Sequence, residues 1–338
     1  MLALVTGGTG FVGYHVVAAL RDQGHQVRAL VRDPMRAQAL LALGADVCVG
    51  DLATGAGIEA AVRGCDAVFH VAAHYSLDRR DDALMYAANV EGTRRLIEAV
   101  RHAGGPRLVY TSSTAAVKLR HDGKPATEAD GFNDPDKVYS TYKKTKVLAE
   151  RLAIDAAKAG MDIVIVNPST PVGPYDVKPT PTGRIVLNTM LGRMPAYVET
   201  GLNLVAVEDV ALGHLLAYAR GRRGERYILG NRNMHFGDLV GTVARLAGRR
   251  PPRTKIPFWV AMSVAIVDDY LLSRLLHHTP RAPWMGSNWR ANRCILTQRK
   301  RYRSLACRSR PLKMPCFERS HGFAKQVWHP YRNDRTDV

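Results

Sequence analysis

The sequence predicts an α/β fold, in which a doubly wound parallel sheet carries helices on both faces and is joined to a smaller C-terminal lobe. Two observations lead to this prediction. Short apolar runs alternate with segments of helical spacing through residues 1–166, and a glycine-rich turn connects the first run to the first helix. Such alternation is typical of βαβ units, because parallel strands need a crossover between them.

The expected elements follow one another with short turns between them. Strands are expected at 2–6, 26–31, 46–49, 67–71, 107–111 and 162–166. Helices are expected at 11–23, 35–43, 58–63, 82–102 and 139–159. Five prolines from Pro168 to Pro181 then predict an irregular loop. Beyond it we expect a lobe over 167–283 that interleaves with the sheet, with strands at 204–207 and 226–229 and helices at 209–219 and 236–247.

The composition indicates a globular protein with a basic, irregular tail at 284–338. Of the 338 residues, 46% are hydrophobic and 23% are charged, which is enough to build a core. The net charge is +18, but the tail alone holds 13 Lys and Arg against 3 Asp and Glu. The tail is either a basic arm for nucleic acid, or a disordered or non-native terminus after a change of reading frame near Trp284. We disfavour nucleic-acid binding, because no binding motif accompanies the charge.

Cysteine content and apolar patterning bear on compartment, metals and membranes. Five cysteines without framework spacing favour the cytoplasm, and we expect no secretory or transit peptide. The cysteines also lack Cys-x-x-Cys spacing, and we expect no metal site. The apolar, amphipathic stretch 256–276 is too interrupted for a membrane span. It is either a core helix of the lobe or a face for peripheral membrane contact.

The glycine-rich turn lies between the first strand and the first helix. Gly7 permits a tight turn, Gly10 lets the backbone approach a pyrophosphate, and Gly13 lets helix and strand pack closely. The N-terminus of the helix supplies positive potential for the phosphates. In this strand-turn-helix context the motif predicts that 1–166 is a dinucleotide-binding domain. The expected contacts are Gly7, Thr9, Gly10, Phe11, Val12 and Gly13.

The end of the second strand indicates which dinucleotide is bound. NAD-binding proteins usually place an acidic residue there for the ribose 2′-hydroxyl. Here Val31 occupies that position and Arg32 follows, so Arg32, with Arg36 as a second candidate, would pair with a 2′-phosphate. We therefore prefer NADP, while Asp33 keeps NAD open. Further cofactor contacts are expected after the third and fourth strands, at Asp51, Leu52, Ala72 and Ala73.

A tyrosine and a lysine four residues apart, Tyr142 and Lys146, share one face of a predicted helix. A cation beside a phenol lowers the phenol pKa from about 10, as a general acid/base for hydride chemistry requires. Tyr139 and Lys143 form a second pair with the same spacing. Ser113 ends the fifth strand, where a hydroxyl group can hold the substrate oxygen.

These motifs together resemble those of the extended short-chain dehydrogenases/reductases. The matching elements are Thr6-Gly7-x-x-Gly10-x-x-Gly13, Asp51-Leu52, His70-x-Ala72-Ala73, Asn89-Val90-x-Gly92-Thr93, Thr111-Ser112-Ser113, Tyr142-x-x-x-Lys146 and Val207-Glu208-Asp209-Val210. The resemblance favours Tyr142 and Lys146 over the second pair. It implies a Rossmann fold, a nicotinamide cofactor, a Ser-Tyr-Lys catalytic set, and Pro168 and Ser169 near the nicotinamide.

Within that family, segments 167–174, 178–184 and 192–198 are most similar to hopanoid-associated sugar epimerases, which are themselves similar to dihydroflavonol 4-reductases. The resemblance implies an epimerase acting on a hopanoid-linked sugar or, as an alternative, an NADPH-dependent ketone reductase. Sugar-nucleotide dehydratases of the family carry an Asp-Glu pair where this chain has Thr114 and Ala115, so dehydration is disfavoured. Substrate contacts are expected at Thr114, Thr170 and Arg184.

Three expectations concern partners and the alternative to catalysis. The substrate is expected to be a small or lipid-linked molecule. The resemblance implies a homodimer formed through the helices at 82–102 and 139–159. A protein that senses a nucleotide without turnover is the rival hypothesis, which the intact Ser-Tyr-Lys set weakens.

Overall fold

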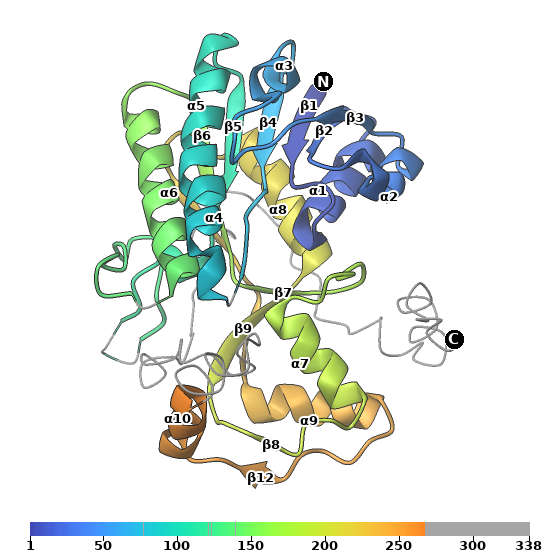
Figure 1. Ribbon diagram of the computed structural model, residues 1–338, viewed down its shortest axis with the longest axis vertical. Helices are drawn as coiled ribbons and strands as arrows, with labels where there is room; N and C mark the ends of the chain where they lie inside the picture. The colour runs from blue at the N-terminus through green and yellow to red at the C-terminus, as the bar shows by residue number, and fades with distance from the viewer. Residues whose placement is uncertain (77, 121, 123, 139, 268–338) are drawn as a thin grey trace.

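The computed structural model describes residues 1–76, 78–120, 122, 124–138 and 140–267. It shows a large sheet flanked by helices, with a smaller group of helices and strands below it (Figure 1). The predictions for the 284–338 tail, for 268–283 and for Tyr139 lie outside the described residues.

Seven parallel strands form the central sheet, in the order β10-β6-β5-β4-β1-β2-β3. They are β1 (Leu2–Thr6), β2 (Gln26–Val31), β3 (Asp46–Val49), β4 (Ala67–His70), β5 (Arg107–Thr111), β6 (Ile163–Pro168) and β10 (Arg226–Leu229). The chain runs outward from β1 through β2 and β3, then returns to build the other half from β4 onward. This reversal beside β1 confirms the predicted doubly wound sheet. It is also the switch point at which sheets of this kind bind ligands.

Helices cover both faces of the sheet. On one face α1 (Phe11–Asp22) and α8 (Val207–Arg220) pack together, and on the other lie α3 (Ile58–Val62), α5 (Gly92–His102) and α6 (Thr141–Lys158). Each helix turns an apolar stripe to the strands, as α5 does by burying Leu96 and Val100 while Arg94 and Arg101 stay exposed. The helix expected at 35–43 is instead a 3₁₀ turn (Pro34–Arg36) followed by α2 (Gln38–Ala42).

The long helix expected at 82–102 contains an irregularity that its sequence pattern does not indicate. A π-helical turn (Ala87–Glu91) separates α4 (Asp82–Tyr86) from α5. Within it, buried Asn89 accepts a hydrogen bond from the His74 backbone N–H (2.7 Å) and donates to the His74 carbonyl oxygen (2.9 Å). Its amide also donates to Thr145 Oγ1 on α6 at 3.1 Å. The π turn therefore ties the loop after β4 to α6.

The smaller lobe has its own sheets and core. A three-stranded sheet has the order β11-β9-β7, and a two-stranded sheet pairs β12 with β8. Leu204, Leu239 and Val243 pack in the core of the lobe. Its elements are β7 (Thr170–Val172), α7 (Pro181–Met190), β8 (Ala196–Tyr197), β9 (Gly201–Ala206), β11 (Arg232–His235), α9 (Phe236–Leu246), β12 (Thr254–Lys255) and α10 (Phe258–Val267).

The prediction of an irregular loop from Pro168 to Pro181 is wrong at both ends of that segment. Pro168 ends β6, and Pro171 lies in β7, an edge strand, where a missing N–H is tolerated. Pro181 is the first residue of α7, a position that needs no N–H donor and suits the fixed φ of proline. Thr180 caps this helix by accepting a hydrogen bond from the Gly183 N–H at 3.1 Å.

Helix α10 is the described part of the stretch 256–276. All of its residues except Ser263 are apolar, so this part lacks the polar face expected of an amphipathic helix. The Trp259 residue at its start is 70% exposed. Within the described part of the chain, every helix is too short or too polar to cross a bilayer.

Candidate active site

The structure brings the predicted site residues together at the carboxyl edge of the central sheet. The strands there end in turns and loops rather than in regular structure, which leaves backbone groups free for a ligand. The glycine-rich turn follows β1, Arg32 follows β2, Asp51 and Leu52 follow β3, and Ala72 and Ala73 follow β4. Ser113 and Thr114 follow β5, Pro168 ends β6, and Ser169 comes directly after it.

Only glycine fits at two positions of the glycine-rich motif, Gly7 in the turn after β1 and Gly13 in the first turn of α1. Gly7 has φ +74°, and a Cβ there would lie 2.6 Å from Ala72 Cα. A Cβ at Gly13 would lie 2.0 Å from the Gly7 carbonyl oxygen. At Gly10 the same carbonyl oxygen is the nearest atom at 3.2 Å, and this glycine is the N-cap of α1. The first N–H groups of α1 therefore have no side-chain cap and suit a phosphate.

Arg32 is exposed just beyond β2, beside a carboxylate that the protein already uses. Asp33 accepts a hydrogen bond from the Met35 N–H at 3.0 Å and pairs with Arg36 Nε at 3.3 Å. The charge of Arg36 is thus partly neutralised by Asp33. The Asp33 carboxylate is already used to cap the turn that follows it. These contacts favour Arg32 as the group that meets a 2′-phosphate.

The turns after β3 and β4 are held in place by hydrogen bonds and by contacts with the core. Asp51 Oδ1 accepts a hydrogen bond from the Ala53 N–H at 2.9 Å, and the Leu52 side chain belongs to the apolar core near α5. Ala72 packs on Gly7, and its N–H donates to Thr6 Oγ1 at 3.3 Å. Ala73, next in the chain, is exposed. Of these predicted cofactor contacts, Leu52 belongs to the buried core and Ala72 packs against that core.

The three predicted catalytic side chains meet at the ends of α6 and β5. Ser140 caps α6 by accepting a hydrogen bond from the Lys143 N–H at 3.4 Å, which fixes the first turn carrying Tyr142. The Ser113 hydroxyl group lies near enough to the Tyr142 phenol to oppose the rise in the Tyr142 pKa. Lys146 is buried, and its Nζ donates to the Thr111 carbonyl oxygen at 2.9 Å.

The ionisation of Tyr142 differs from the prediction. Burial raises the pKa of Tyr142 to about 12, Tyr75 adds to the rise, and the Ser113 hydrogen bond opposes it. Burial also lowers the pKa of Lys146 to about 8, against the opposing charge of Glu150. For the protein groups alone, the expectation that Lys146 lowers the Tyr142 pKa is wrong, because the ammonium group is directed at the Thr111 carbonyl oxygen. At neutral pH Tyr142 is a neutral phenol and Lys146 a cation.

The predicted substrate contacts lie on the side of the site that faces the smaller lobe. Tyr75 packs edge-on against Tyr142, with ring centroids 4.8 Å apart. Arg184 on α7 acts electrostatically on Tyr75 and on Asp176, and opposes the rise in pKa that burial causes at both. Arg184 is therefore linked to the catalytic tyrosine through Tyr75. Thr114 begins the turn after Ser113, and Thr170 lies in β7.

Three buried polar atoms at this edge have no hydrogen-bond partner among the described residues: Ser169 Oγ, Asn167 Oδ1 and His74 Nε2. Because buried polar atoms are normally paired, such atoms suit a polar ligand. Together with the open N-terminus of α1 and exposed Arg32, they fit a nicotinamide dinucleotide lying along the carboxyl edge.

Sequence reasoning missed two residues that organise the site, Glu150 and His214, and it found Asn89 in a family motif without giving it a role. His214 on α8 lies close to the Val210 carbonyl oxygen through Nδ1 (2.7 Å) and to Thr111 Oγ1 through Nε2 (2.9 Å). His214 therefore holds Thr111, whose carbonyl oxygen accepts the hydrogen bond from Lys146. The sequence does show a histidine on the apolar face of the helix that contains His214. That pattern does not indicate which residue the histidine contacts.

No described cluster of three or more His, Cys, Asp or Glu side chains is placed to hold a metal ion. His70 and His74 are four residues apart, but His70 is fully engaged elsewhere. Its Nδ1 lies 2.7 Å from Thr6 Oγ1 and its Nε2 lies 3.0 Å from Thr93 Oγ1. Burial and the charge of Lys146 lower the pKa of His70 to about 3, which keeps it neutral.

The packing of the turn predicts the effect of one added methyl group. We expect Gly13→Ala to lower the free energy of unfolding by roughly 1–3 kcal/mol, because its Cβ would overlap the Gly7 carbonyl oxygen. It should also weaken nucleotide binding. Gly131→Ala is the matched control, since nothing lies within 4 Å of its Cβ. Thermal unfolding and nucleotide titration measure both effects, and equal behaviour of the two variants would contradict this account.

Buried His214 predicts a loss of stability in acid. Burial lowers its pKa to about 4, so the unfolded chain, with a histidine pKa near 6.5, binds a proton first as the pH falls. Stability from this group is therefore complete above about pH 6.5 and declines toward pH 4. Between pH 7 and 5 the wild-type protein should lose on the order of 2 kcal/mol of its free energy of unfolding through this group, and His214→Gln should not show that part of the loss. Urea unfolding across pH measures this slope, and exposed His102→Gln should leave it unchanged.

The chain is similar to known proteins over most of its length. "Putative dihydroflavonol 4-reductase" from Synechocystis sp. is 43% identical over 324 residues, covering 94% of this chain and 93% of that protein. Sterol demethylase protein B from Methylococcus capsulatus is 36% identical over 83% of this chain and 85% of its own length. The crystal structure of gox2253 is 41% identical, with a TM-score of 0.82 over 95% of this chain and 99% of that one.

A family model agrees with these similarities and with the geometry of the site. The model described as "NAD dependent epimerase/dehydratase family" matches residues 3–230, which include the glycine-rich turn, Ser113 and the Tyr142/Lys146 pair. The resemblance to extended short-chain dehydrogenases/reductases is confirmed. The chain therefore belongs to the NAD dependent epimerase/dehydratase family and is an NAD(P)-dependent enzyme.

Proposed function

We propose that this enzyme is an NADP(H)-dependent oxidoreductase that reduces a ketone to an alcohol, with Tyr142 as the proton donor. The observation that carries the proposal is the neutral phenol of Tyr142 beside Ser113 and one helical turn from buried, cationic Lys146. A phenol with a raised pKa holds its proton at neutral pH and can give it to an oxygen that gains negative charge.

The residues at the carboxyl edge would hold the cofactor in one orientation. The N-terminus of α1 would take the pyrophosphate, Arg32 the 2′-phosphate, and Pro168 and Ser169 would lie at the nicotinamide end. NADPH bound in this way supplies a hydride. The Ser113 hydroxyl group would hold the substrate oxygen, and Tyr142 would donate its proton to that oxygen. Lys146 would add a buried positive charge one helical turn from the proton donor.

The smaller lobe would supply the substrate side of the site. We propose that residues from 167 onward form the substrate lobe, because Arg184 of α7 acts electrostatically on Tyr75, whose ring packs against Tyr142. Thr114 and Thr170 would add polar contacts. A peripheral membrane contact and a homodimer stay predictions.

An epimerase would use the same residues but return the hydride to the opposite face of the substrate. Such an enzyme needs Tyr142 to accept a proton in its first, oxidising half-reaction and to return it in the second. The hopanoid-linked sugar substrate stays a prediction from resemblance. Denaturing freshly purified protein and identifying any released nucleotide separates the reactions. Tightly retained cofactor would favour the epimerase, and reversible binding of NADPH would favour the reductase.

The proton-donor role predicts the outcome of removing one oxygen atom. Tyr142→Phe should reduce kcat by at least about 100-fold, the scale of a general acid's contribution, while NADPH binding stays close to wild type. Tyr86→Phe is the matched control, because Tyr86 is 45% exposed on α4. The measurement is NADPH oxidation across a panel of ketones, with binding followed by NADPH fluorescence. Unchanged turnover in Tyr142→Phe would remove the assignment.

The role of Arg32 predicts a change of cofactor preference. Arg32→Ser should weaken NADPH binding by about 10-fold or more and leave NADH binding nearly unchanged, because only NADPH carries the 2′-phosphate. Arg36→Ser should have a smaller effect, since Arg36 already pairs with Asp33. Titration calorimetry with both nucleotides measures the preference. If Arg36→Ser had the larger effect, the phosphate contact would belong to Arg36.

A further inference from the structure

A buried carboxylate lies one helical turn beyond Lys146. Glu150 on α6 is 0% exposed, and each of its oxygens is engaged. Oε2 accepts hydrogen bonds from Ser112 Oγ and from Asn167 Nδ2, the latter at 2.8 Å, and Oε1 pairs with Arg226 Nε at 2.6 Å. A carboxylate taken out of water is costly unless such partners surround it, so this network holds together as a unit.

The partners of Glu150 come from three neighbouring strands of the central sheet. Ser112 directly follows β5, Asn167 lies in β6, and Arg226 begins β10. Asn167 Nδ2 also donates to the carbonyl oxygen of Ser113 at 3.1 Å. Glu150 is therefore one hydrogen-bond step from the backbone of Ser113 by way of Asn167, and one residue from it by way of Ser112.

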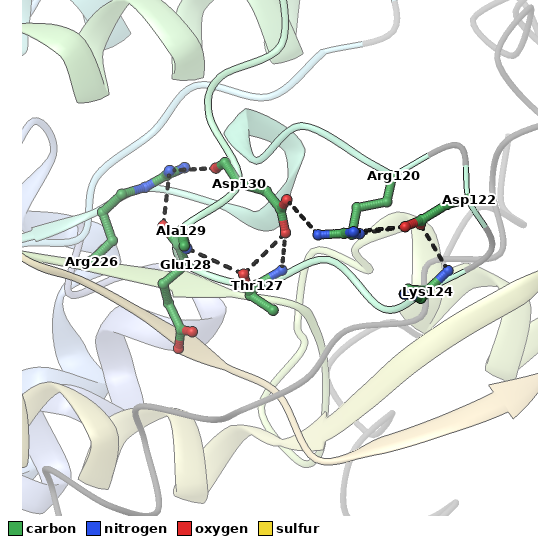
Figure 2. A network of polar contacts seen from close by, with 8 residues as sticks. All are labelled: Arg120, Asp122, Lys124, Thr127, Glu128, Ala129, Asp130 and Arg226. Atoms are coloured by element: carbon green, nitrogen blue, oxygen red, sulfur yellow. Dashed lines mark hydrogen bonds and ion pairs between the residues drawn. The ribbon is translucent and has the colours of Figure 1, made fainter.

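Arg226 is held in place from its other side by the segment that follows β5. Its Nη1 donates to the carbonyl oxygens of Asp130 at 3.0 Å and Glu128 at 3.5 Å, as Figure 2 shows. The Asp130 carboxylate in turn pairs with Arg120 at 3.3 Å. The guanidinium group also lies 4.7 Å from the centroid of the Phe132 ring. These contacts fix the cation that faces Glu150.

Charges alternate along this buried line, from Lys146 to Glu150 to Arg226. Other groups face Lys146 from the neighbouring elements. The Tyr110 ring of β5 lies 5.7 Å away, and His70 of β4 feels the Lys146 charge and is neutral. Tyr142 on α6 is neutral as well. Glu150 is the group that opposes the desolvation of Lys146 by raising its pKa.

We propose that Glu150 is a positioning residue of the active site: its buried carboxylate, one helical turn from Lys146, is the counter-charge to that lysine and holds the ends of β5 and β6 so that Ser113 faces Tyr142. The consequence for turnover rests on the proposed function. The two structural effects on Lys146 and Ser113 do not.

Two substitutions should move the Lys146 pKa in opposite directions. Glu150→Gln removes the anion and leaves two buried cations, so the Lys146 pKa should fall from about 8 by about one unit or more. Arg226→Met removes the cation that competes for Glu150, so the Lys146 pKa should rise. The readout is an NMR titration of protein labelled with ¹³C at lysine Cε, with the Lys146 signal assigned by its loss in Lys146→Met.

Opposite shifts cannot come from a general loss of stability, which would affect both variants alike. Glu128→Gln is the control, because it removes a buried carboxylate that accepts a hydrogen bond from the Ile228 N–H at 3.2 Å, away from Lys146. It should lower the melting temperature without moving the Lys146 titration. If Glu150→Gln does not fold, the upward shift in Arg226→Met still decides the matter.

An unchanged Lys146 titration, or shifts of the same sign in both variants, would overturn the proposal. The titration needs no substrate, so its result stands apart from turnover. If the shifts occur but no ketone is reduced, the proposed function fails alone. If ketones are reduced but the shifts are absent, the role of Glu150 fails alone.

Discussion

The burial of the Lys146 ammonium group constrains much of the structure around it. Removing a cation from water is costly, and burial lowers its pKa to about 8. The fold compensates with the Thr111 carbonyl oxygen, the Tyr110 ring and the charge of Glu150. Each of these is itself braced, Thr111 by His214 on α8 and Glu150 by three strands. Helices on both faces of the sheet thus take part in presenting one charge to the site.

Most of the central fold could be predicted from local patterns. The strands of the first half and the helices α1, α5, α6 and α8 follow from apolar periodicity, and the turn after β1 from its glycines. The smaller lobe was harder, because short strands such as β7 and β11 gain their identity from partners distant in sequence. The prolines misled for the same reason: Pro171 is acceptable in β7 only because that strand lies at an edge.

The candidate site was predictable as a set of residues but not as an electrostatic arrangement. A spacing of four places Tyr142 and Lys146 on one helix face, yet it does not say where the ammonium group points. That direction depends on Thr111 and Glu150, and the pKa of Tyr142 depends on Tyr75 and Ser113. Glu150 and His214 were not predicted, and Asn89 was found in a motif but given no role, because the partners of all three lie on other elements and no sequence motif identifies those partners.

The π turn between α4 and α5 changes the rotational alignment of the two helices about their common axis. One residue more or less in a helix rotates everything beyond it by about 100°. Met85 on α4 is 2% exposed and its neighbour Leu84 is 40% exposed, so α4 has a defined inner side. Without the extra residue in the turn, that inner side and the buried stripe of α5 would lie out of alignment. The length of this stretch is therefore as strictly determined as its composition, and an insertion or deletion here would disturb α4 more than a substitution would.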